Sequence, residues 1–139
     1  MDHKLKLMVV DDSPLFRTWL IRSLSEDDRF QVVGYAVNAL DAQEKIPLLQ
    51  PDMLTLDIEM PGMSGIDFLK QLLPVHPIPV ILVSSLNLRV FDALEAGAVD
   101  FVRKPDEANG LSKEIFLSML RSKLMVAAAS HVHLPSAPA

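Results

Sequence analysis

The sequence predicts an α/β domain in which a five-stranded parallel sheet is covered by helices on both faces, a doubly wound architecture. Short apolar segments alternate along the chain with segments whose apolar residues have helical spacing. The apolar segments are almost continuously hydrophobic, which is typical of strands buried on both faces. Because the connections are also short, each strand and the helix after it form a βα unit, and the strands are expected to lie parallel.

The five predicted strands are residues 5–10, 30–36, 53–56, 80–83 and 99–102. The first predicted helix begins near Pro14, since proline fits the first helical position and the side chain of Asp12 or Ser13 can cap the helix. Its apolar residues have helical spacing, and we expect Trp19 to be partly buried among them; they are Leu15, Phe16, Trp19, Leu20 and Leu24.

The later helices are read from the same spacing and from their end signals. The second is predicted over residues 38–49, where Pro47 should kink or end the last turn. The fourth is short and runs to about residue 96, with Gly97 just past its end. The fifth begins near Ser112 and has apolar residues at core spacing, namely Ile115, Met119 and Leu120. The third carries the apolar residues Ile66, Phe68, Leu69, Leu72 and Leu73.

The last part of the chain has a different composition. From Ala127 onward it consists largely of Ala, Ser, His and Pro, without clear periodicity. We therefore place one folded domain at residues 1–126 and a disordered tail, or the start of an interdomain linker, at 127–139. The alanine run at residues 127–129 leaves open the alternative that it extends the last helix.

Composition excludes several classes of function. The 139 residues carry a net charge of −5, which argues against general nucleic-acid binding. The absence of cysteine excludes disulfides and thiolate metal sites, and it suits a reducing compartment. No apolar run approaches the roughly 20 residues that a membrane span needs. We expect a cytoplasmic protein without membrane insertion.

Polar residues follow four of the predicted strands. Asp11 and Asp12 follow the first strand, Asp57 the third, Ser84 the fourth and Lys104 the fifth. In an open parallel sheet the carboxyl ends of the strands share one rim, and ligands bind beyond it. These side chains should therefore gather at a single site.

The chemistry of that set points to a metal and a phosphoryl group. Three neighbouring carboxylates repel one another unless a cation compensates, and oxygen ligands suit Mg²⁺. With the metal in place, Asp57 could attack phosphorus and form an acyl phosphate. Lys104 and the Ser84 hydroxyl would then hold the phosphoryl oxygens.

Four motifs in this sequence resemble those of the response-regulator receiver domain. The resemblance covers about residues 5–125. Residues 58–61, 83–86 and 97–102 are most similar to the receiver of chemotaxis protein-glutamate methylesterases. The four motifs are Val9-Val10-Asp11-Asp12-Ser13, Leu56-Asp57-Ile58-Glu59-Met60-Pro61-Gly62-Met63-Ser64-Gly65, Val83-Ser84 and Val102-Arg103-Lys104-Pro105.

The resemblance implies a fold, a reaction and a set of partners. The fold would be flavodoxin-like, (βα)5, with strand order 2-1-3-4-5. Asp57 would be the phosphoacceptor, supplied by a histidine kinase, and its phosphorylation would regulate an output domain or partner protein. Mg²⁺ would be held by Asp11, Asp12, Asp57 and the backbone carbonyl of Glu59.

The resemblance also assigns roles to the remaining site residues. Lys104 would bind the phosphoryl group, and Ser84 would be the switch hydroxyl. Phe101 would be the rotating aromatic residue, although it could equally be an ordinary core residue. The Lys104–Pro105 peptide bond is expected to be cis.

Two departures from the methylesterase pattern bear on function. Only 13 positions separate Ser84 from Gly97, about one helical turn fewer, so the fourth helix or its entry loop should be short. The sequence also lacks a G-x-S-x-G motif, so we do not expect this chain itself to be an esterase. The parent protein would be the methylesterase.

Two alternatives remain open at this point. The chain could be a free-standing receiver instead of part of a methylesterase. More remotely, it could be a phosphatase that uses Asp57 as nucleophile, with Glu59 two residues later as the general acid. The short chain leaves little room for the substrate-specificity cap that such a phosphatase would need.

Overall fold

The structure is a computed structural model that describes residues 4–60, 62–85, 89–106, 108 and 110–133. Within these residues the strands are β1 (Leu5–Val10), β2 (Phe30–Ala36), β3 (Met53–Leu56), β4 (Val80–Ser84) and β5 (Asp100–Arg103). The helices are α1 (Pro14–Ser25), α2 (Ala39–Leu49), α3 (Gly65–Leu72), α4 (Arg89–Glu95) and α5 (Lys113–His133).

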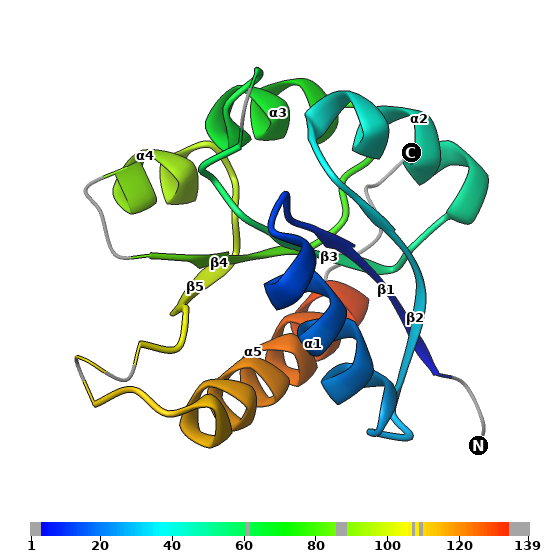
Figure 1. Cartoon of the computed structure of the whole chain (residues 1–139). Helices are drawn as coiled ribbons and strands as arrows, with labels where there is room; N and C mark the ends of the chain where they lie inside the picture. Colours follow the sequence, from blue (N-terminus) through cyan, green and yellow to red (C-terminus); the bar gives the residue numbers. More distant parts are fainter. Residues whose placement is uncertain (1–3, 61, 86–88, 107, 109, 134–139) are drawn as a thin grey trace.

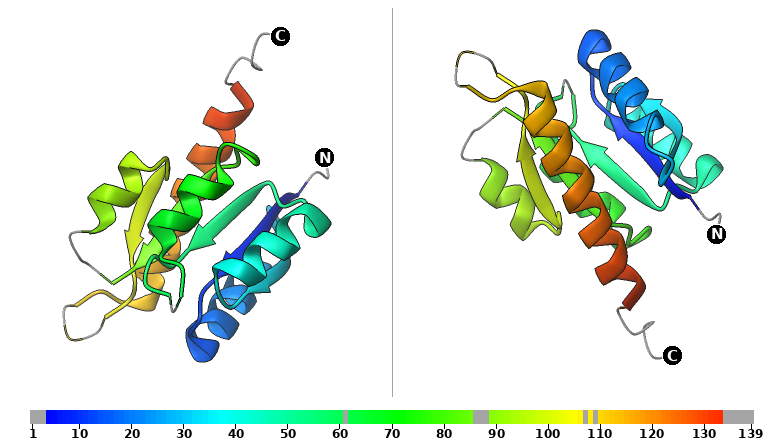
Figure 2. Two further views of the ribbon diagram at one scale, coloured as in Figure 1. Left: turned by 90° about the horizontal axis from the view of Figure 1, so that it is seen from above. Right: turned by 90° about the horizontal axis from the view of Figure 1, so that it is seen from below.

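The strands form one parallel sheet in the order β2-β1-β3-β4-β5. Helices α2, α3 and α4 cover one face of this sheet, and α1 and α5 cover the other (Figure 1). Figure 2 shows the two faces in turn: α2, α3 and α4 lie in front of the strands in the view from above, and α1 and α5 in the view from below. The predicted doubly wound, flavodoxin-like (βα)5 fold and its strand order are confirmed.

The core is divided by the sheet because successive strand residues point to opposite faces. In β1, Met8 and Val10 pack on the side of α2, α3 and α4, whereas Leu7 and Val9 pack on the side of α1 and α5. All four side chains are almost fully buried. This two-sided burial explains why the strand sequences are continuously apolar instead of alternating.

The first helix begins at Pro14, as predicted, but neither predicted cap forms. Ser13 occupies the N-cap position without a side-chain hydrogen bond to the helix. Its backbone N–H instead donates to the Asp11 carboxylate at 2.8 Å. Leu20 and Leu24 are buried, and Trp19 is partly buried as expected, but Leu15 points into solvent.

The buried face of α5 agrees with the prediction at Leu120, which is buried, but not at the other two predicted core positions. Ile115 and Met119 were expected in the core, yet they are 51% and 41% exposed. Apolar residues occur on both sides of this helix, so spacing alone did not identify the inner side. The buried positions follow a helical repeat one residue further along the chain, at Phe116, Leu120, Leu124 and Ala127.

The expected disordered tail is wrong for residues 127–133, because α5 continues to His133. Ala127 and Ala128 are buried against the core on the α1 and α5 side of the sheet. Alanine has the highest helix propensity, and this contact adds packing energy. Of the two alternatives for the alanine run, extension of the helix is therefore the correct one. Residues 134–139 lie outside the described residues, and the division into domain and linker stays a prediction.

The ends of α2 and α4 agree with their sequence signals. The Asn38 side chain caps α2 by accepting the Asp41 N–H at 2.8 Å, and the helix ends two residues after Pro47. Helix α4 has only 7 residues, as the short spacing between Ser84 and Gly97 predicted. Gly97 follows it with a φ of 119°. Among the described residues, no helix is both long and apolar enough to cross a membrane.

Candidate functional site

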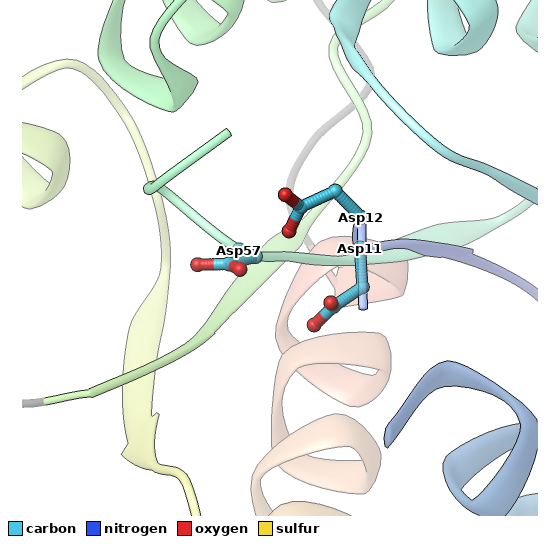
Figure 3. A group of neighbouring side chains, drawn as sticks. All are labelled: Asp11, Asp12 and Asp57. Carbon is cyan, nitrogen blue, oxygen red and sulfur yellow. The ribbon is translucent and has the colours of Figure 1, made fainter. Parts of the chain in front are cut away.

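Three aspartates meet where β1 and β3 end. These strands pair directly, with Val10 beside Leu56, so the residues that follow them are neighbours. One carboxylate oxygen from each of Asp11, Asp12 and Asp57 lies within 4.8 Å of the others. Figure 3 shows the three side chains grouped at this edge of the sheet. The predicted gathering of these residues at one rim is therefore present in the structure.

The backbone fixes the two buried carboxylates. Asp11 and Asp57 are only 2% and 5% exposed, whereas Asp12 lies in solvent. In each buried residue Oδ1 accepts the N–H two positions later, from Ser13 at 2.8 Å and from Glu59 at 3.0 Å. These tight turns hold the carboxylates in place beyond the ends of the strands.

Lys104 connects the two buried carboxylates. Its Nζ lies 3.0 Å from Asp11 Oδ2 and 3.3 Å from Asp57 Oδ2. Its backbone N–H donates to the Ser84 carbonyl at 3.0 Å, which extends the β4–β5 pairing by one residue. Lys104 therefore reaches the aspartates from the end of β5, which is separated from β3 by β4.

Burial and charge act in opposite directions on these groups. Burial raises the pKa of Asp57 above its ordinary value, and the Glu59 N–H and Lys104 offset this only in part. Burial by itself would lower the pKa of Lys104, but Asp11 and Asp57 outweigh it and raise that pKa. One ammonium therefore does not fully compensate the buried carboxylates.

The donor set fits Mg²⁺. A divalent cation suits a cluster of carboxylate oxygens that one lysine leaves under-compensated, and Mg²⁺ prefers oxygen ligands while keeping several waters. Exposed Asp12 gives the cluster an open side toward solvent. The predicted role of the Glu59 carbonyl as a ligand stays a prediction.

Ser84 and Phe101 lie at the ends of neighbouring strands. Phe101 is paired with Leu82, and both pack on the side of α2, α3 and α4. Because strand side chains alternate between faces, Ser84, two residues after Leu82 in β4, belongs to that side as well. Phe101 is only partly buried. The Ser84 hydroxyl is fully buried and lacks a hydrogen-bond partner among the described residues. An unsatisfied buried hydroxyl beside a polar site is suited to a group that arrives later.

The chain matches the response regulator receiver domain family over residues 7–116. It belongs to that family. This receiver domain is 46% identical over 130 residues to a protein-glutamate methylesterase/protein-glutamine glutaminase of Syntrophomonas wolfei, covering 94% of the chain and 38% of the relative. A relative of the same name from Xanthomonas oryzae is 44% identical, with 99% of the chain and 40% of the relative covered. The chain thus spans about two fifths of the length of these curated relatives.

Solved structures support the receiver family, and one of them is the receiver of a methylesterase relative. The response regulator domain of Thermotoga maritima CheB superposes with a TM-score of 0.80 at 36% identity, covering 91% of this chain and 98% of that one. The receiver domain of NarL from Mycobacterium tuberculosis gives 0.71 at 32% identity, covering 86% and 96%. The resemblance to methylesterase receivers that the motifs indicated is confirmed.

One expectation about the receiver site is wrong. The Lys104–Pro105 peptide bond was expected to be cis, but the described residues contain no cis peptide bond. The trans form is the ordinary state of a peptide bond before proline, favoured by about 0.5–1 kcal/mol. In this trans form Lys104 still reaches both buried carboxylates.

Two residues near the site were not singled out from the sequence. Gly65 begins α3 so close to the segment after β3 that a Cβ there would lie 2.6 Å from Ile58 Cα. Phe16 places its ring centroid 4.5 Å from Lys104 Nζ. Gly65 appeared only within a motif, and Phe16 only as one apolar position of α1; neither contact has a local sequence signal.

Proposed function

We propose that this receiver domain takes a phosphoryl group from a histidine kinase onto Asp57, with Mg²⁺ bound by Asp11, Asp12 and Asp57. The observation that carries the proposal is the carboxylate cluster, in which Lys104 bridges the two buried aspartates at 3.0 and 3.3 Å. Two-component signalling is the setting in which receivers of this family act.

The arrangement of the site side chains supports this proposed transfer. The Glu59 N–H holds Oδ1 of Asp57, and Oδ2 lies beside the Lys104 ammonium. A carboxylate oxygen of Asp57 forms a bond to phosphorus while the bond from phosphorus to the kinase histidine nitrogen breaks. The imidazole then recovers its proton from solvent. Lys104 neutralises phosphoryl oxygens, and bound Mg²⁺ would supply charge stabilisation to the transferring group.

Ser84 supports the response to phosphorylation. Its buried hydroxyl lacks a partner within the described structure and can donate to an oxygen of the new phosphoryl group. The Phe101 side chain is only partly buried on the same side of the sheet. We therefore assign Ser84 the switch role, and Phe101 the role of the aromatic residue that changes position with it.

We further propose that the regulated output is a methylesterase domain of a longer protein. Two observations support this proposal. The curated relatives are named as methylesterases, and this chain covers only 38–40% of their length. Phosphorylation of the receiver would then control access to that domain. A free-standing receiver acting on a partner protein is the alternative.

Phosphorylation is tested with acetyl phosphate and Mg²⁺, followed by intact mass. We expect wild type to gain one phosphoryl group, and the gain to disappear when the metal is chelated. Asp57→Asn should not be modified. Asp28→Asn is the matched control. Asp28 is an exposed carboxylate just before the amino end of β2, whereas Asp57 follows the carboxyl end of β3. Equal modification of wild type and Asp57→Asn would disprove the assignment.

The methylesterase context is tested separately. The gene is sequenced beyond the codon for Ala139, where we expect an open reading frame that encodes an esterase domain. A stop codon at that point would contradict the longer protein and favour the free-standing receiver. The outcome does not affect the phosphorylation of Asp57.

A further inference from the structure

The ammonium of Lys104 is enclosed on three sides. It has three N–H donors, and two sides face Asp11 Oδ2 and Asp57 Oδ2 at 3.0 and 3.3 Å. Another side faces the ring of Phe16, whose centroid is 4.5 Å from Nζ. The lysine side chain is only 19% exposed. The aromatic ring is therefore part of the immediate surroundings of the cation.

The Phe16 ring is itself held by an aromatic cluster from two helices. It lies 5.7 Å from the Trp19 ring within α1 and 5.8 Å from the Phe116 ring of α5, in tilted and edge-on arrangements. Phe16 is only partly buried, whereas Leu20 of the same helix is fully buried. Its position therefore serves the contact with Lys104 as well as the core.

A ring face attracts a cation without accepting a conventional hydrogen bond. A polar partner at the same place would occupy an N–H donor, and that bond would have to break when a phosphoryl group arrived. The ring restrains the ammonium and excludes water on its side, while the donors stay directed at oxygen atoms. The ammonium is therefore held in a fixed position, while its N–H donors can change from one oxygen acceptor to another.

We propose that Phe16 is a positioning residue for Lys104: its ring holds the ammonium beside Asp57 by cation–π attraction and leaves the N–H donors for carboxylate and phosphoryl oxygens. This proposal rests on the proposed phosphorylation of Asp57. It assigns to α1 a contribution to the reaction beyond the packing of its apolar face.

The test varies the charge of the ring face at nearly constant size. Phe16 is replaced by mono-, di- and trifluorophenylalanine, because fluorine withdraws electron density from the ring. The rate of phosphorylation by acetyl phosphate should fall stepwise across this series, and Phe16→Leu should be slower by about fivefold. Phe16→Tyr keeps the aromatic face and should restore most of the rate.

The same fluorinated residues at position 116 provide the matched control. Phe116 belongs to the same aromatic cluster and contacts Phe16. If packing alone mattered, both series would lower the rate alike. We expect the trend only at Phe16. A flat series at Phe16, or equal trends at the two positions, would overturn the proposal.

A second measurement is independent of phosphorylation. Trifluorophenylalanine at position 16 should lower the equilibrium constant for folding by about twofold to fivefold. This loss should disappear in a Lys104→Met background, since no cation then faces the ring. An equal loss in both backgrounds would overturn the proposal. If wild type is not phosphorylated at all, the proposed function fails, while this cycle still decides whether Phe16 and Lys104 interact.

Discussion

Replacing Gly65 with alanine tests how closely α3 approaches the segment after β3 that carries Asp57 and Ile58. The new Cβ would lie 2.6 Å from Ile58 Cα and 3.2 Å from the Asp57 carbonyl oxygen, so backbone must move. Gly→Ala at a compatible backbone position ordinarily stabilises a protein by about 0.4–1 kcal/mol. Overpacking costs about 1–3 kcal/mol and should prevail here, for a net loss of about 1–2 kcal/mol. The sign of the change therefore decides between the two effects.

The assay is thermal unfolding followed by circular dichroism without metal. For a domain of this size the loss corresponds to a Tm about 3–7 °C lower. Because the displaced segment carries Asp57, phosphorylation by acetyl phosphate should also slow in the folded variant. Gly110→Ala is the control: Gly110, between β5 and α5, has a φ of +73° and open space around its Cβ position, so alanine there strains the backbone without overpacking a neighbour. It should lower the Tm without slowing phosphorylation. A neutral or stabilised Gly65→Ala would refute the close approach.

Three further predictions concern the charges and the hydroxyl of the site. Mg²⁺ at about 100 times its Kd should stabilise the domain by about 2.7 kcal/mol, seen as a rise in Tm of about 9 °C, and Asp12→Ala should abolish this rise; an unchanged wild-type melting curve would contradict the metal site. Because the pKa of Asp57 is raised from 3.8 in the folded state, the folded protein keeps a proton there that the unfolded chain has lost. Without metal, this carboxyl's contribution to stability should thus be fully present below pH 3.8, the unfolded value, and be lost as pH rises through the folded pKa; urea unfolding of Asp57→Asn should lack that fall, and identical pH profiles would contradict it. Ser84→Ala removes a buried hydroxyl without a partner in the described structure, so urea unfolding should show a stability equal to wild type or higher by up to about 1 kcal/mol, and a loss above that size would reveal a partner.

The fold could be predicted because its main signals are local. Continuous apolar strands, short connections and end signals such as Asn38 and Gly97 each reflect a few neighbouring residues. Helix α5 shows the limit of such reasoning. Ile115 and Phe116 are both apolar, and only the position of the helix against the sheet decides that Phe116 is buried and Ile115 exposed. The buried alanines at 127 and 128 likewise depend on a contact with the core.

The site could be predicted in its membership but not in its geometry. The topology of a parallel sheet brings Asp11, Asp57 and Lys104 to one rim, so their proximity followed from strand ends alone. The distribution of the lysine's bonds over both buried carboxylates did not follow, nor did the ring of Phe16 beneath it. These details depend on side-chain packing between segments far apart in the sequence.

The bridging position of Lys104 relates the stability of the domain to its chemistry. A lysine paired with Asp57 alone would leave buried Asp11 without its ion pair, and a lysine paired with Asp11 alone would leave the nucleophile less often ionised. Contact with both gives each buried carboxylate an ion pair while leaving Asp57 under-compensated. Under the proposed function, a cation entering beside exposed Asp12 would supply the missing charge. In the proposed reaction, Lys104 would exchange a carboxylate oxygen of Asp57 for a phosphoryl oxygen on the same residue without leaving Asp11 or the Phe16 ring.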